Sequence, residues 1–135
     1  AAGEKLKFRQ KDIVLRGHAI ECRINAEDPY NFVPSPGKLT TFHMPGGPGV
    51  RIDTHAYAGY TVPPHYDSMI GKLIVYGMDR EDARQRMSRA LDLFKVSGVA
   101  TTIGLQKFLI NQERFIEGRM NTMLVAEVLP EYSGS

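Results

Sequence analysis

One stretch of the sequence decides the fold: Arg16-Gly-His-Ala-Ile-Glu-Cys-Arg-Ile-Asn-Ala-Glu-Asp-Pro29. Apolar and polar side chains alternate between residues 17 and 26, which is typical of a β-strand with one buried face. The strand ends at Asp28 and Pro29, because proline cannot extend a ladder of backbone hydrogen bonds. The face that we expect to be buried carries His18, Ile20, Cys22 and Ile24.

The opposite face of this strand carries three polar residues in alternation, Glu21, Arg23 and Asn25. Such a face must meet water, a ligand or charged partners. Arg23 is the most informative of the three, because a guanidinium is always charged and is shaped for two-point contact with a carboxylate or another oxyanion. Two interpretations remain open: a contact with an anionic ligand, or an ion pair with Glu21 or Glu27 that merely covers the edge of the sheet.

Further strands are expected from the same kind of pattern. The run from 69 to 76 is almost continuously apolar, which predicts a central strand covered on both faces. Asp67 lies just before this run and could orient the guanidinium of Arg23. The other expected strands are a short one from Ile13 and two more over residues 38–43 and 50–54.

The pattern changes to helical spacing after residue 78. A first helix is predicted to begin at Asp79 and to end at Ser97-Gly98. Two more are expected, one from residue 101 or 102 to a break at 117–118 and one from 121 or 122 to 129. Strands followed by helices indicate an α+β fold: an antiparallel or mixed β-sheet from the N-terminal two-thirds, with helices from the C-terminal third packed on one side.

Composition narrows the class of protein. A chain of 135 residues with 42% hydrophobic and 24% charged residues is typical of one soluble globular domain. The net charge is only +2, and both signs are interspersed, which argues against a nucleic-acid groove or an anionic membrane as partner. No apolar run approaches the roughly 18 residues that span a bilayer. The chain begins Ala1-Ala2-Gly3 without methionine, so we expect a piece of a longer protein.

The residues that most often carry chemistry give little signal here. His18 and Cys22 share a strand face but lie about 13 Å apart, too far to bind one metal ion, so no metal site is expected. Cys22 is expected to be a small buried apolar residue, and as the single cysteine it forms no internal disulfide. Residues 45–49 form a turn and not a phosphate loop, because a strand follows and the two prolines lack N–H donors. The arginines of the first helix predict a solvated face and not an RNA surface.

Four motifs, in this order, resemble the C-terminal domain of biotin carboxylases. The resemblance covers essentially all of the chain. The motifs are Arg16 to Pro29 as quoted above, Pro34-Ser-Pro-Gly-Lys38, Gly59-Tyr-Thr-Val-Pro-Pro-His-Tyr-Asp-Ser-Met-Ile-Gly-Lys-Leu73 and Ser97-Gly-Val-Ala-Thr-Thr102.

The resemblance implies the first half-reaction of acetyl-CoA, propionyl-CoA and pyruvate carboxylases. In that reaction ATP and bicarbonate carboxylate a biotin attached to a carrier protein or domain, and in an acetyl-CoA carboxylase this step serves fatty acid biosynthesis. The family binds ATP and Mg²⁺ in an ATP-grasp region that would lie upstream of this chain. The isolated chain is therefore expected to be inactive. The expected compartment is the cytoplasm, or the mitochondrial matrix if the parent is eukaryotic.

The resemblance also suggests roles for individual residues. Arg23 matches the arginine that contacts bicarbonate and the ureido oxygen of biotin, and so becomes the expected catalytic residue. Glu21 and Asn25 share its strand face, and we expect them to orient it. Asp67 is expected to anchor either this arginine or a contact between two copies of the protein. No metal ligand is expected.

Arg51 and Met69 match positions associated with the homodimer interface of the family. Met123 stands where some relatives place a polar residue near the adenine pocket, so no nucleotide contact is expected from this chain. We expect a connector from the ATP-grasp region over residues 1–15, the biotin carboxylase C-terminal domain over 16–130 and a tail over 131–135. A stand-alone dimerisation module without a catalytic role is the alternative.

Overall fold

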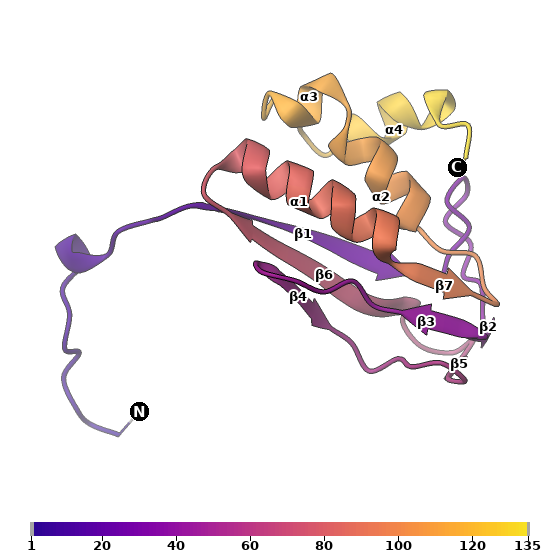
Figure 1. Ribbon diagram of the computed structural model, residues 1–135, viewed down its shortest axis with the longest axis horizontal. Helices are drawn as coiled ribbons and strands as arrows, with labels where there is room; N and C mark the ends of the chain where they lie inside the picture. Colours follow the sequence, from indigo (N-terminus) through magenta and orange to yellow (C-terminus); the bar gives the residue numbers. More distant parts are fainter. Residues whose placement is uncertain (1, 135) are drawn as a thin grey trace.

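The computed structural model describes residues 2–134, in which antiparallel strands form three small sheets and helices lie on one side of the largest of them (Figure 1). The first α-helix begins where expected, because the side chain of Asp79 accepts a hydrogen bond from Asp82 N at 2.8 Å and caps it. The strands are β1 (His18–Asn25), β2 (Gly37–Lys38), β3 (Thr41–His43), β4 (Val50–Asp53), β5 (Thr61–Val62), β6 (Met69–Gly77) and β7 (Lys95–Ser97). The helices are α1 (Arg80–Leu93), α2 (Ile103–Ile110), α3 (Glu113–Ile116) and α4 (Leu124–Val128), with 3₁₀ turns at Gln10–Asp12 and Leu129–Glu131.

The strands pair as one three-stranded sheet in the order β1-β6-β4 and as two short ribbons, β2-β5 and β3-β7. Every one of these pairings is antiparallel. The helices lie over one face of the three-stranded sheet (Figure 1). The expected α+β class is therefore confirmed, although the strands divide into three small sheets and β7 comes from the C-terminal third of the chain.

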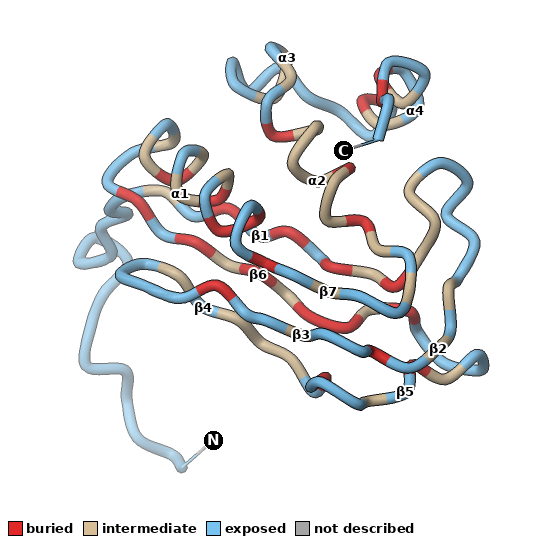
Figure 2. The backbone as a smooth tube through the Cα atoms, turned by 45° about the vertical axis from the view of Figure 1, so that its right-hand side comes forward, coloured by how far each residue is buried: buried red, intermediate tan, exposed pale blue. Residues whose placement is uncertain are grey.

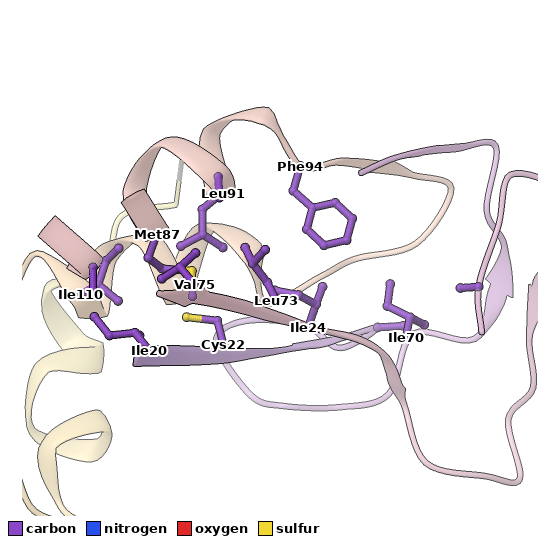
Figure 3. Close-up of a cluster of buried hydrophobic side chains, with 14 of the residues drawn as sticks. Ile20, Cys22, Ile24, Ile70, Leu73, Val75, Met87, Leu91, Phe94 and Ile110 are labelled. Atoms are coloured by element: carbon purple, nitrogen blue, oxygen red, sulfur yellow. The ribbon is translucent and has the colours of Figure 1, made fainter. Parts of the chain in front are cut away.

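The core lies between the sheet and helices α1 and α2. The inner face of β1 is buried as the alternation predicts at Ile20, Cys22 and Ile24, each at most 8% exposed, whereas His18 at the start of the strand is only half-buried. These side chains contact those of β6 and α1, as Figure 3 shows. In Figure 2 the buried stretches of the chain lie on the same elements. Among the largest buried side chains are Leu73 and Val75 from β6, Met87 and Leu91 from α1, and Phe94 after it.

The expectation that β6 is covered on both faces was wrong. The strand is central, but only its inner face is buried in the described chain. Its other face carries Lys72, Ile74 and Tyr76, and Tyr76 is 51% exposed. Because Ile74 and Tyr76 are apolar and yet lie on the open face, the sequence of residues 69–76 appears continuously apolar. Hydrophobicity along this strand therefore could not separate a covered face from an open one.

The first helix ends earlier than predicted. It stops at Leu93, and residues 95–97 form strand β7, which pairs with β3. Phe94 causes the change, because its backbone is extended and its ring packs edge-on against Phe42 with the centroids 5.5 Å apart. The expected strand at Ile13 is also absent, since residues 13–16 are exposed and without regular structure.

Strand β5 had no counterpart in the expected order, and the expected second helix is divided into α2 and α3. The last expected helix is split into α4 and the 3₁₀ turn over Leu129–Glu131. Tyr132, in the expected tail, packs back on the domain, because its ring lies against Tyr30 and Phe108. None of the helices in residues 2–134 is long and apolar enough to cross a membrane.

Candidate functional site

In the part of the chain that the structure describes, one face of the three-stranded sheet has no helix packed on it, and we call it the outer face. Its residues come from β1, β6 and β4 in register. Arg23 lies opposite Lys72, and Lys72 lies opposite Asp53 on β4. In the next row Glu21 lies opposite Ile74, which in turn lies opposite Arg51. Two cations therefore stand directly across from each other, an arrangement that costs stability unless an anionic group lies between or beside them.

Arg23 extends from the outer face with 70% of its side chain exposed. Its nearest charged partner is Glu21, with Nε and Oε1 3.9 Å apart. An exposed pair at this distance contributes little to stability. Glu27, the other partner considered, accepts hydrogen bonds from Asn25 and Ser68 instead. The guanidinium of Arg23 thus keeps most of its donors available for a ligand.

Segments that are far apart in the sequence meet at the C-terminal end of β1. Ser35 N donates to Ala26 O at 2.8 Å, and Ala26 N donates to Ser68 O at 2.8 Å. Thr102 N donates to Asn25 O at 3.1 Å. The strand end just beyond Arg23 is therefore held by the loop after β1, the loop before β6 and the start of α2.

A polar cluster lies beside this strand end. Asn25 Nδ2 donates to Glu27 Oε1 at 3.1 Å, and the Ser68 hydroxyl donates to the same oxygen. Asn25 is therefore on the predicted face, but it contacts Glu27 and not Arg23. Its Oδ1 is buried without a hydrogen-bond partner among the described residues. Ser68 was missed by sequence reasoning, since only the folded chain brings it to β1.

Within residues 2–134, no hydrogen bond or ion pair joins Asp67 to Arg23. Its Oδ1 accepts a hydrogen bond from Met69 N at 2.8 Å, so it stabilises the turn that enters β6. Its part in a contact between two copies stays a prediction, as do those of Arg51 and Met69. Arg51 is exposed and makes two hydrogen bonds to Asp53, at 2.8 and 2.9 Å. These bonds, and then the positive charges of Arg51 and Lys72, lower the pKa of the Asp53 carboxyl.

A sizeable cavity lies elsewhere. It measures about 540 Å³ and is lined by Tyr30, Asp92, Lys107 and Tyr132 among others, but not by Arg23. Arg23 stands on an open surface. In residues 2–134 no three His, Cys, Asp or Glu side chains are grouped so as to hold a metal ion.

Cys22 is buried as expected, at 3% exposure. Burial, and then the charge of Glu21, raises the pKa of its thiol to about 12. Because the thiolate is the reactive form, we expect iodoacetamide to leave the folded chain unlabelled at pH 8 and to label it quickly in urea. Labelling should begin only as the pH approaches 12. Mass spectrometry can follow this single thiol, and equal labelling rates in buffer and urea would show that the thiol is not protected.

The family model and close relatives all identify biotin carboxylases as the proteins that this chain resembles. The family model of the biotin carboxylase C-terminal domain matches residues 21–127. Biotin carboxylase of Allochromatium vinosum is 57% identical over 129 residues, which cover 96% of this chain and 29% of that protein. Biotin carboxylase of Pseudomonas aeruginosa is 57% identical over 121 residues, which cover 90% of this chain and 27% of that protein.

Solved structures of a biotin carboxylase and of a biotin carboxylase domain also resemble this chain. The biotin carboxylase domain dimer of the Hydrogenobacter thermophilus 2-oxoglutarate carboxylase, in complex with MgADP, ADP and bicarbonate, superimposes with a TM-score of 0.93 at 41% identity. Biotin carboxylase from Campylobacter jejuni, in a β-γ-ATP complex, gives a TM-score of 0.86 at 44% identity. These matches cover 99% and 93% of this chain but only 30% and 28% of those chains. The chain therefore spans less than a third of the length of the proteins it resembles.

Proposed function

This chain belongs to the biotin carboxylase C-terminal domain family, and from that premise we propose that it is the C-terminal domain of an enzyme that carboxylates biotin. The observation that carries the proposal is the family match over residues 21–127, because it includes Arg23 and the part of β1 on either side of it. The domain would supply one wall of an active site whose other wall comes from the rest of the parent enzyme. The open position of Arg23 fits such a shared site.

The proposed role of Arg23 follows from charge. When the ureido N1 of biotin loses its proton, negative charge develops on the ureido oxygen. A guanidinium that is already in place there stabilises the transition state without reorganisation. The same group can hold bicarbonate by two-point contact. Lys72, directly across from Arg23, adds to the positive potential at this end of the outer face.

ATP and Mg²⁺ would drive the reaction by activating bicarbonate, and we assign their binding to the ATP-grasp region of the parent. The described residues do not group ligands for a metal ion, so we assign no step to a metal held by this chain. The partner that brings the substrate would be a biotin carboxyl carrier protein or domain. What this chain contributes is the arginine and the strand that carries it.

A homodimer belongs to the same proposal, with Arg51 and Met69 in the contact between two copies. The exposed outer face supports it, since β4 lies at the edge of the sheet and Arg51 projects from it. The dimer of the Hydrogenobacter thermophilus domain supports it as well. A dimerisation module without catalytic role would use the same face, and the following experiment separates the two.

We expect the purified chain to show no biotin-dependent ATP hydrolysis, because the nucleotide is bound elsewhere. Addition of the separately expressed ATP-grasp region should restore biotin carboxylation, measured as fixation of labelled bicarbonate. Size-exclusion chromatography at several concentrations reports self-association, and the Arg51→Glu and Met69→Glu chains should remain monomeric. Self-association without restored activity would favour the module, and biotin-dependent ATP hydrolysis by the chain alone would contradict the proposed division of roles.

A further inference from the structure

Thr102 occupies the N-cap position of α2 but does not cap that helix. Its hydroxyl is used on β1 instead. Thr102 Oγ1 accepts a hydrogen bond from Asn25 N at 3.0 Å and donates to Arg23 O at 3.5 Å. Thr102 is only 5% exposed, so these bonds form out of contact with bulk water. A threonine at the N-cap position usually accepts hydrogen bonds from the N–H groups of its own helix. Here its hydroxyl bonds to a neighbouring strand instead.

Gln106 lies one helical turn after Thr102 and faces the same strand. Its Nε2 donates to Arg23 O at 3.1 Å. The carbonyl oxygen of Arg23 can accept two hydrogen bonds, and α2 provides both donors. Since β1 is at the edge of its sheet in the described chain, this carbonyl has no further strand there to pair with.

The hydrogen bonds from α2 act where the strand is irregular. The register of β1 against β6 shifts between Ile24 and Asn25, immediately after Arg23. Such irregularities change the direction of nearby side chains. Among the described residues, the Arg23 side chain has only the 3.9 Å contact to Glu21 to orient it. The backbone therefore sets the place from which the guanidinium reaches a ligand.

We propose that Thr102 and Gln106 are positioning residues for Arg23, which fix its strand to α2 and thereby hold the guanidinium at the distance that biotin requires. This inference rests on the proposed function of Arg23. It assigns a role to two residues that follow Arg23 by 79 and 83 positions in the sequence.

The test uses the full-length carboxylase that contains this chain. Thr102→Val and Gln106→Met remove the donors with little change in side-chain volume. Each should lower kcat/KM for biotin by about ten- to a hundredfold, because small displacements of a catalytic group have effects of this size. The KM for ATP should not change. Thr102→Ser keeps the hydroxyl and should remain within about twofold of the wild type.

Matched controls come from neighbouring positions. Thr101→Val makes the same change one residue earlier, at a half-buried threonine whose hydroxyl makes no hydrogen bond in the described chain. Gln85→Met repeats the glutamine-to-methionine change at a residue on the exposed side of α1. Both should leave kcat/KM unchanged. Hydrogen exchange at Asn25 N, measured by mass spectrometry on the β1 peptide, should be faster in Thr102→Val than in Thr101→Val.

The Arg23→Ala background separates positioning from general loss of structure. If Thr102 acts through Arg23, Thr102→Val should have no further effect on kcat/KM once Arg23 is alanine. An equal loss in both backgrounds, a raised KM for ATP, or failure of Thr102→Ser to preserve activity would overturn the proposal. If Arg23→Ala is inactive while Thr102→Val and Gln106→Met are fully active, only the positioning role fails. If Arg23→Ala itself is fully active, the proposed function of Arg23 fails as well.

Discussion

Replacing Arg23 with alanine in the full-length carboxylase is expected to lower kcat for biotin carboxylation by about 10²- to 10³-fold, the usual effect of removing one donor that stabilises a developing oxyanion. The protein should remain folded. The Arg23 side chain is 70% exposed and its ion pair with Glu21 is long, so the free energy of unfolding should change by no more than about 0.5 kcal/mol. Fixation of labelled bicarbonate and urea unfolding measure the two quantities on the same preparations.

Two further variants define what the arginine does. Arg23→Lys keeps the charge but loses the planar pair of donors, and it should recover only part of the rate. Arg89→Ala removes a cation from the solvent side of α1 and should leave the rate unchanged. If Arg23→Ala carboxylates biotin at the wild-type rate, or unfolds, then Arg23 has the structural role of covering the sheet edge.

Local pattern was sufficient for β1 because its two faces differ in polarity from Ile20 to Asn25. Ile20, Cys22 and Ile24 are buried and Glu21 and Arg23 are exposed, as alternation predicts. The same rule was insufficient for β6, where Ile74 and Tyr76 are apolar and yet lie on the open face. Alternation identifies a buried face only when the other face is polar.

The candidate site was predictable only where it depends on local sequence. Arg23 and Glu21 could be placed on one face from their spacing, and Asn25 with them. The residues that hold this strand end, Ser68, Thr102 and Gln106, come from the loop before β6 and from α2, and no local pattern links them to β1. Asp67 shows the opposite error: its proximity to β6 suggested a contact with Arg23, whereas its carboxylate bonds to the adjacent turn.

The end of α1 was missed for a reason that itself can be tested. Helical spacing continues through Phe94, but this residue is 1% exposed with an extended backbone, and it packs between α1 and Phe42 of β3. Phe94→Ala should therefore lower the free energy of unfolding by about 3–5 kcal/mol, because it removes a large buried side chain and leaves a cavity. Urea unfolding of the chain should show a lower midpoint with an unchanged slope.

Leu93→Ala is the matched control, since Leu93 is adjacent in sequence but 55% exposed, and its effect should stay within about 0.5 kcal/mol. Equal effects at the two positions would mean that α1 continues through Phe94 and that β7 does not form.

The loss of Phe94 is also expected to affect the candidate site. Phe94 leads into β7, and β7 leads through Gly98 to Thr102, so its loss should also speed hydrogen exchange at Asn25 N, where α2 holds β1. Exchange at Asn25 N that is unaffected by Phe94→Ala would show that α2 keeps its place on β1 without the packing of Phe94.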